Sequence, residues 1–137
     1  MLTKAAIIAI ITLQAPKYGI EPELALAVVE HESQFNVKAT SPVGAIGLFQ
    51  IMPSSQPSYS KEQIRHPATN IKLGLKMLAE YKKSCVHRDR LNWLVCYNYG
   101  PANAKKVKYP EKFPYVKKIS EILRRIKAEK ERVVSTY

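Results

Sequence analysis

The chain has 137 residues, of which 46% are hydrophobic and 24% are charged, and it shows no internal repeat. This composition excludes a low-complexity or solenoid protein, and the length allows one domain with a core of its own. Lys and Arg number 22 against 11 Asp and Glu, so the formal net charge is +11. We therefore expect a single domain over residues 1–137 that is attracted to polyanions, a class that includes nucleic acid, anionic lipid and cell-wall polymers.

The positive charge lies mainly in the C-terminal part of the sequence. Residues 1–60 carry a net charge of −1, residues 61–100 carry +5 and residues 101–137 carry +7. Asp occurs only once, as Asp89, so few carboxylates are available for a reaction that needs two of them.

The first predicted helix covers roughly residues 3–17 and ends near Gly19. Within it, the apolar stretch Ala5–Leu13 follows Lys4 as the core of a signal peptide would, but no small-residue cleavage site follows and the stretch is too short to span a bilayer. Apolar residues recur there at a spacing of three and four, which favours an amphipathic helix: Ile7, Ile8, Ile11 and Ala15.

A second predicted helix begins at Pro22, continues to about residue 33 and carries an acid on its apolar face. Glu32 shares that face with four apolar side chains, whereas Glu30 points toward the solvated side. Burial and a helix C-terminus both disfavour an ionised carboxylate, so we expect a raised pKa for Glu32 and the ability to donate a proton. The alternative is a buried Glu satisfied by an Arg or by backbone groups. The four apolar residues are Leu24, Ala25, Val28 and Val29.

The middle of the chain is predicted to form a loop, a short helix and a long helix. The loop contains Ser41, Pro42 and Gly44, and the apolar run after it predicts a short helix at residues 46–52. Residues 53–67, rich in Ser and Pro, are predicted as loop. The segment 67–85 predicts a helix of about 17 residues because apolar residues recur on one face.

Two further helices are predicted in the C-terminal part. One covers residues 90–100 and ends at Gly100, and the other begins at Pro114 and runs to about residue 130, with the last ten residues expected to fray. No segment has a clear strand pattern, so the predicted class is all-α. The basic C-terminal helix has an apolar stripe flanked by Lys and Arg: Val116, Ile119, Leu123 and Ile126.

The cysteines and histidines give no sign of a metal centre. Cys85 and Cys96 could form one disulfide, but in a chain without an evident secretion signal we expect two reduced thiols, with Cys96 in the core. The three His residues are scattered along the sequence, so we predict no metal and no cofactor: His31, His66 and His87.

Several motifs in the same order resemble the lytic transglycosylase family of the soluble-lysozyme-like (SLT) type. The resemblance covers about residues 5–126 and implies a lysozyme-like fold of the goose type, with a substrate cleft walled by the helix at 22–33 and the segment around Tyr97. Phe49, Tyr99 and His66 depart from the family pattern. The matching motifs are "ESQF" from Glu32, Ala39 and Ser41, "GAIGLFQIMP" from Gly44, "NIKLG" from Asn70 and "CYNYGP" from Cys96.

The resemblance also implies roles for individual residues. Glu32 matches the catalytic acid, and Ser41 matches a serine near the bound N-acetyl group. Gln50 and Met52 match positions that line the sugar-binding cleft. Tyr97 and Asn98 match a pair whose tyrosine hydroxyl approaches the catalytic carboxylate. Met52 in the core, and a Tyr97 hydroxyl satisfied by the backbone, are the alternatives.

The implied reaction needs only one carboxylate. Glycoside hydrolases usually use two, and Glu62, Glu80 and Asp89 lie in basic, surface-like surroundings. In a lytic transglycosylase of peptidoglycan, the 6-hydroxyl of N-acetylmuramic acid (MurNAc) attacks its own anomeric carbon. The bond from MurNAc to N-acetylglucosamine (GlcNAc) is then cleaved to leave 1,6-anhydro-MurNAc ends. Glu32 would act first as acid and then as base, with no cofactor.

Two other functions stay open. A goose-type lysozyme would hydrolyse the same bond on the same scaffold, and a basic polyanion-binding module would explain residues 101–137 but not the acid on an apolar face. We expect a monomer that acts on peptidoglycan glycan strands, contacts anionic wall or outer-membrane surfaces through its basic C-terminal part and has no specific nucleic-acid partner. A phage lysis protein in the host cytoplasm, a virion-associated enzyme, or a periplasmic enzyme whose signal was trimmed would all fit.

Overall fold

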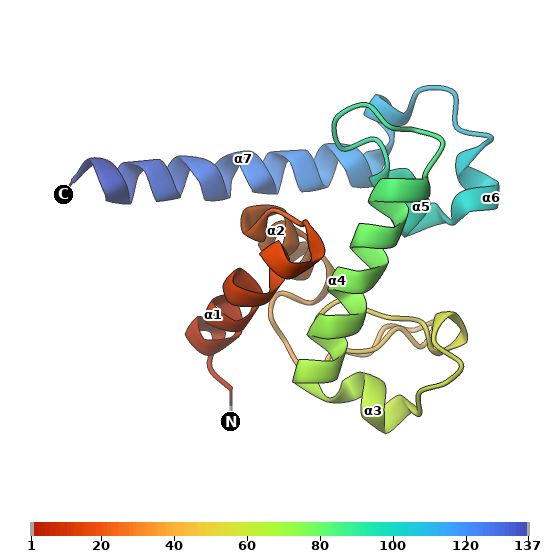
Figure 1. The fold of residues 1–137 in the computed structure, drawn as a ribbon, viewed down its shortest axis with the longest axis horizontal. Coiled ribbons are helices and arrows are strands. Elements are labelled where there is room, and N and C mark those ends of the chain that lie inside the picture. The colour runs from red at the N-terminus through yellow and green to blue at the C-terminus, as the bar shows by residue number, and fades with distance from the viewer. Residues whose placement is uncertain (1, 137) are drawn as a thin grey trace. The chain divides into compact units, whose positions relative to one another are not determined.

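The structure, a computed structural model, describes residues 2–136 and is built from helices (Figure 1). In that range the only β pairing is a pair of isolated bridges, from Thr40 to Ile46 and from Ile46 to Ile51, so the predicted all-α class is confirmed. None of the described helices is both long enough and apolar enough to cross a membrane. The α-helices are α1 (Lys4–Gln14), α2 (Pro22–Ser33), α3 (Lys61–Arg65), α4 (Pro67–Ser84), α5 (Leu94–Tyr99), α6 (Pro101–Ala104) and α7 (Pro114–Ser135), and 3-10 turns lie at Ala15–Tyr18, Pro53–Ser55 and Pro110–Lys112.

The chain forms two compact units, one up to Lys76 and one from Met77, with the boundary inside α4. The division does not test the prediction of a single domain over residues 1–137, which stays a prediction.

In the first unit, α1 and α2 pack against each other as their apolar faces predict. The Thr3 hydroxyl caps α1 by accepting a hydrogen bond of 3.1 Å from the N–H of Ala6. Gly19, with φ +70°, takes the left-handed conformation that ends the following 3-10 turn, and Pro22 begins α2. The buried side chains of the two helices are Ile7, Ile11, Leu24, Ala25, Ala27, Val28 and Val29.

The prediction of a short helix at residues 46–52 is wrong. Ile46 and Ile51 instead donate backbone hydrogen bonds to each other, of 3.0 and 2.9 Å, and close a tight turn. Gly47 and Gln50 lie in this turn with φ +75° and +49°, a left-handed conformation that no right-handed helix contains. The apolar run does not distinguish the two structures, because a buried turn and a short buried helix have the same composition.

The segment predicted as loop at residues 53–67 contains the short helix α3. Ser60 caps it by accepting from the N–H of Gln63 at 3.1 Å, while the Gln63 side chain accepts from the N–H of Ser60 at 2.8 Å. This capping box is a sequence signal, Ser followed three residues later by Gln, and reading it would have corrected the prediction.

In the second unit, α5 contacts both α6 and α7. The predicted helix at 90–100 begins four residues late, at Leu94, although it ends at Gly100 as expected. The basic C-terminal helix begins at Pro114 as predicted but continues through Ser135, beyond the predicted end near residue 130 and into the last ten residues, where fraying was expected. Of its predicted stripe, Val116 and Ile119 are buried, whereas Leu123 and Ile126 are half-buried.

The prediction that Cys85 and Cys96 are free thiols is also wrong, because the two are joined by a disulfide. Cys85 follows the end of α4 and Cys96 lies in α5, with their Cα atoms 5.9 Å apart, a separation that a disulfide can bridge. Both are buried, Cys96 as expected. Residues 86–95 fold back toward the end of α4 and bring the two cysteines together. No pattern in the sequence predicts this fold-back.

Candidate active site

Glu32 lies in the last turn of α2, and the backbone just after it fixes where the helix stops. Gln34 and Phe35 have φ values of +52° and +62°, and the N–H of Gln34 donates to the carbonyl of Glu30 at 3.0 Å. Left-handed residues at this position end a helix and turn the chain away. Ser33 is buried and donates its hydroxyl to the carbonyl of Val29 at 3.1 Å, so this side chain is held against its own helix.

The exposure of Glu30 and Glu32 on α2 differs from the prediction. Glu32 is half-buried rather than interior, and Glu30 is half-buried rather than solvated. The helix ends one residue after Glu32, so the apolar face on which it was predicted reaches the unit's surface there. The carboxylate of Glu32 therefore borders a pocket and not the core.

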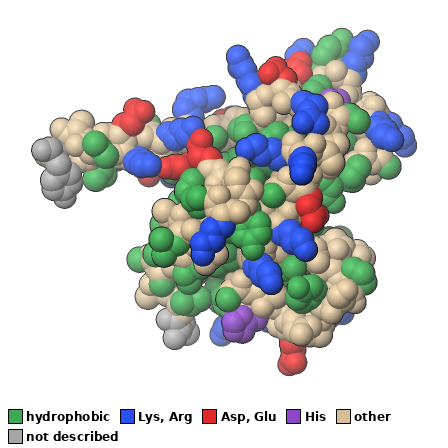
Figure 2. Space-filling view, viewed as in Figure 1, with side chains coloured by type: hydrophobic (Ala, Val, Ile, Leu, Met, Phe, Trp, Pro, Cys, Tyr) green, Lys and Arg blue, Asp and Glu red, His purple; other side chains and the backbone are tan. Residues whose placement is uncertain are grey.

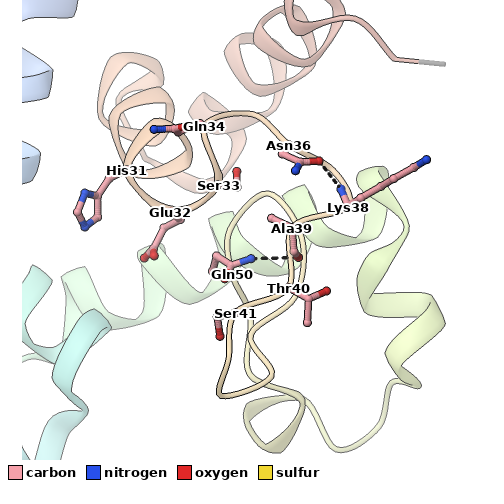
Figure 3. A pocket seen from close by; sticks show the side chains of 10 residues that line it. All are labelled: His31, Glu32, Ser33, Gln34, Asn36, Lys38, Ala39, Thr40, Ser41 and Gln50. Atoms are coloured by element: carbon pink, nitrogen blue, oxygen red, sulfur yellow. Dashed lines mark hydrogen bonds between the residues drawn. The ribbon is translucent and has the colours of Figure 1, made fainter.

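That pocket has a volume of about 570 Å³ and is formed by the end of α2, the loop that follows it and Gln50. Figure 3 shows the Glu32 side chain leaving α2 on the side of the loops that carry Ser41 and Gln50. Three of the predicted site residues are thus brought together, and Glu32 is the only carboxylate in the lining. The lining residues are His31, Glu32, Ser33, Gln34, Asn36, Lys38, Ala39, Thr40, Ser41 and Gln50.

The Gln50 side chain ties two loops together. Its amide nitrogen donates to the carbonyl of Ala39 at 3.2 Å and to the carbonyl of Gly47 at 3.0 Å, as Figure 3 shows for Ala39. Both amide hydrogens are therefore used within the protein, and in the described part of the chain no group donates to the amide oxygen. Gln50 presents an acceptor at the pocket.

The Ser41 hydroxyl, in contrast to the Gln50 amide oxygen, is available as a hydrogen-bond donor. Its oxygen accepts a hydrogen bond of 3.0 Å from the N–H of Ala45, and the N–H of Ser41 donates to the carbonyl of Ala45 at 2.9 Å. These two bonds fix the serine in its turn. The hydroxyl hydrogen has no acceptor among residues 2–136, so Ser41 can donate to a bound group.

Asn70 on α4 helps to form the site, although the sequence identifies it only as part of the "NIKLG" motif. Its side chain is fully buried. The amide nitrogen donates to the carbonyls of Ile46 and Ile64 at 2.9 and 2.8 Å, and the amide oxygen accepts from the N–H of Phe49 at 2.8 Å. These bonds hold the turn that carries Gln50. An amide at the start of an apolar helix face is the signal that could have identified it.

The remaining predicted site residues lie outside this pocket's lining. Met52 is 38% exposed. Tyr97 and Asn98 lie on α5 in the second unit, where Tyr97 is half-buried with its ring edge-on to Tyr81, at 6.2 Å between ring centroids and 80° between planes. Asn98 is exposed. The approach of Tyr97 to the catalytic carboxylate and the contacts of Met52 and Asn98 with sugar stay predictions.

The pocket offers one carboxylate, one hydroxyl donor and one amide acceptor. Across residues 2–136, no group of three or more His, Cys, Asp and Glu could hold a metal ion. A single carboxylate between polar groups of fixed direction can exchange a proton with a bound molecule whose orientation the other two set.

Comparison with known proteins identifies relatives of one kind. A family model described as the transglycosylase SLT domain matches residues 9–119. The soluble lytic murein transglycosylase of Escherichia coli strain K12 is 36% identical over 96 residues, which cover 63% of this chain and 15% of that protein. The transglycosylase of Enterobacteria phage PRD1 is 39% identical over 64 residues, which cover 47% of this chain and 24% of that protein. The chain thus spans less than a quarter of the length of these relatives.

The fold is similar to that of a solved lytic transglycosylase. The structure of Slt from Pseudomonas aeruginosa superimposes with a TM-score of 0.64 and 27% sequence identity over 72% of this chain and 17% of that one. The protein in that structure is an inactive variant in which a glutamate is replaced by glutamine. This similarity confirms the lysozyme-like fold predicted from the sequence.

Proposed function

Because the chain belongs to the transglycosylase SLT domain family, we propose that it is a lytic transglycosylase that cleaves the glycan strands of peptidoglycan. The bond cleaved is the one from MurNAc to GlcNAc, and the product ends in 1,6-anhydro-MurNAc. The single observation that carries this proposal is the pocket in which Glu32, Ser41 and Gln50 meet with no second carboxylate in its lining. One carboxylate suffices only if the second reactive group comes from the substrate or from water.

In the proposed reaction, Glu32 moves a proton twice. Its protonated carboxyl donates to the glycosidic oxygen as the bond to the anomeric carbon of MurNAc breaks, and the leaving sugar keeps that proton as its 4-hydroxyl. The 6-hydroxyl oxygen of MurNAc bonds to the same anomeric carbon, and its proton passes to the Glu32 carboxylate. The acid is restored, and no water is consumed.

Ser41 and Gln50 orient the sugar in this scheme. The Ser41 hydroxyl donates to the carbonyl oxygen of an acetamido group, and the Gln50 amide oxygen accepts from a sugar hydroxyl or an acetamido N–H. Because internal hydrogen bonds already fix both side chains, little conformational entropy is lost when the sugar binds. The similarity to a phage transglycosylase supports the proposal that the protein acts in phage lysis or entry.

Cleavage of purified sacculi by matched variants tests the role of Glu32. Glu32→Gln keeps the shape of the side chain but cannot carry the proton, so release of soluble muropeptides should fall by about 10²–10⁴-fold or more. Glu30→Gln, the same change two residues earlier on α2 and outside the pocket lining, should release them at the wild-type rate. A Glu32→Gln protein that is folded and fully active would contradict the proposed role of Glu32 in proton transfer.

A further inference from the structure

The second unit carries an exposed surface in which lysines surround aromatic rings. Tyr99 and Tyr109 are 48% and 53% exposed. The segment between and after these tyrosines carries four exposed lysines, and Phe113 next to the last of them is half-buried. We call this set the basic aromatic surface; its members are Tyr99, Lys105, Lys106, Lys108, Tyr109, Lys112 and Phe113. Figure 2 shows Lys and Arg side chains, with hydrophobic ones between them, over the part of the chain where Figure 1 places α5 and α6.

The rings and ammonium groups of this surface contact one another. The Nζ atoms of Lys108 and Lys112 lie 5.6 and 5.1 Å from the centroid of the Tyr109 ring, within the range of a cation–π interaction. The rings of Tyr99 and Phe113 lie 5.6 Å apart between centroids and are tilted by 42°. These contacts hold two positive charges near the Tyr109 ring and pack the Tyr99 ring against Phe113.

Short backbone hydrogen bonds hold the segment that carries the surface. The N–H of Lys112 donates to the carbonyl of Tyr109 at 3.0 Å, and the N–H of Phe113 donates to the carbonyl of Pro110 at 3.0 Å. Pro110 at the start of this 3-10 turn and Pro114 at the start of α7 further restrict the backbone. The surface is therefore built on a segment with few conformations to lose when a ligand binds.

The charge of the surface is not neutralised within the protein. In the part of the chain that the structure describes, none of the four lysines forms an ion pair, and the one acid of the segment, Glu111, forms none either. From Met77 onward the chain has fifteen Lys and Arg against six Asp and Glu, a balance of +9. An anionic ligand is therefore attracted to this unit.

We propose that the basic aromatic surface binds the peptide stems of peptidoglycan through their carboxylates, an inference that rests on the proposed function. The sugar backbone of peptidoglycan carries no net charge, so the stems supply the carboxylates that lysines attract. Tyr99 and Tyr109 present apolar faces to the stem side chains and to neighbouring sugar rings. The four basic residues are all Lys, which act as point charges. Point charges of this kind attract carboxylates and phosphates alike, and the proposed action on peptidoglycan is what favours the stem carboxylates.

The test compares binding to intact sacculi with binding to sacculi whose stem carboxylates have been converted to amides. The Glu32→Gln protein is used throughout so that the substrate is not cleaved. Lys108→Gln with Lys112→Gln should weaken binding to intact sacculi by about fivefold at low salt and leave binding to amidated sacculi unchanged. Lys72→Gln with Lys76→Gln, an exposed pair on α4 with the same spacing and charge change, is the control and should change neither.

Three outcomes would overturn the inference. Equal loss on intact and amidated sacculi would mean that the surface does not recognise the stem carboxylates, and no loss on either would mean that it binds no part of the wall. A loss of binding to a single-stranded oligonucleotide without a loss on sacculi would identify a nucleic-acid surface. Release of muropeptides by the enzyme with Glu32 intact is measured separately, so failure of the proposed function is seen there and not in the binding assay.

Discussion

The side-chain oxygen of Asn70 accepts a hydrogen bond of 2.8 Å from the backbone N–H of Phe49, which lies 21 residues earlier in the chain. The same amide donates to Ile46 and Ile64, so one buried side chain joins α4, the end of α3 and the turn before Gln50. Since Gln50 lines the pocket with Glu32, the geometry of the candidate site depends on a residue that does not line it.

Replacing Asn70 should therefore lower both stability and activity. Asn70→Ala leaves the buried Phe49 N–H and two carbonyls without their partner, and the free energy of unfolding should fall by about 2–4 kcal/mol. Urea denaturation measures this, with the exposed Lys72→Ala on the same helix as control. At temperatures where Asn70→Ala is fully folded, its kcat should still be reduced because the turn that carries Gln50 is free to move. An unchanged kcat would make Asn70 a structural residue alone.

Gly47 should tolerate a side chain less well than Gly44, although both have positive φ. A Cβ on Gly47 would collide with the amide of Asn70, whereas a Cβ on Gly44 would meet nothing within 4 Å. Gly44→Ala therefore bears only the left-handed backbone cost of about 1–2 kcal/mol. Gly47→Ala should lose at least about 1 kcal/mol more, because Asn70 cannot move without breaking its bonds. Thermal or urea unfolding of both variants measures the difference, and equal losses would show that the Asn70 amide yields easily.

The disulfide should stabilise the second unit without taking part in the reaction. Cys85 and Cys96 are 11 residues apart in sequence, and closing a loop of this size contributes about 2–3 kcal/mol. A reductant should lower the melting temperature of the wild type and leave that of the Cys85→Ser, Cys96→Ser double variant unchanged. Both should still release muropeptides below their melting temperatures. A wild-type melting temperature that does not respond to the reductant would show that the bond is not formed in solution.

The end of α7 should contribute electrostatic attraction to the wall. Beyond the buried Ile122 the helix carries exposed basic residues together with acids, and Arg125 pairs with Glu129 at 3.3 Å. Neutralising Lys127, Lys130 and Arg132 should weaken association with sacculi at low salt and have little effect at high salt, because screening removes the attraction between exposed charges. A loss of activity that is the same at every ionic strength would point to a structural role for these residues.

The sequence predicted the elements whose signals are local. The apolar spacing of α2 and α4, together with the prolines that begin α2 and α7, located these helices to within a few residues. The C-terminal end of a helix also has a local signal, and Gly100 correctly predicted where α5 ends. The position of Glu32 in the last turn of α2 followed from the same pattern.

Features that depend on tertiary contacts were not predictable. Gln50 adopts φ +49° because Asn70, Ala39 and Gly47 hold its loop, and without those partners the apolar run resembles a helix. The disulfide likewise depends on the return of residues 86–95 to the end of α4. The half-buried state of Glu32 depends on the loop that opens the pocket beside it, which the periodicity of α2 does not describe.

The mass of the glycan ends released by the wild-type enzyme tests the central proposal most directly. In the proposed reaction the Glu32 carboxylate accepts the proton of the MurNAc 6-hydroxyl. Mass spectrometry of digested sacculi should then show muropeptides that end in 1,6-anhydro-MurNAc, each lighter by one water than its hydrolysed counterpart. Reducing ends throughout the digest would contradict the proposal, because water and not the 6-hydroxyl would then attack the anomeric carbon, and the protein would be a lysozyme on the same scaffold.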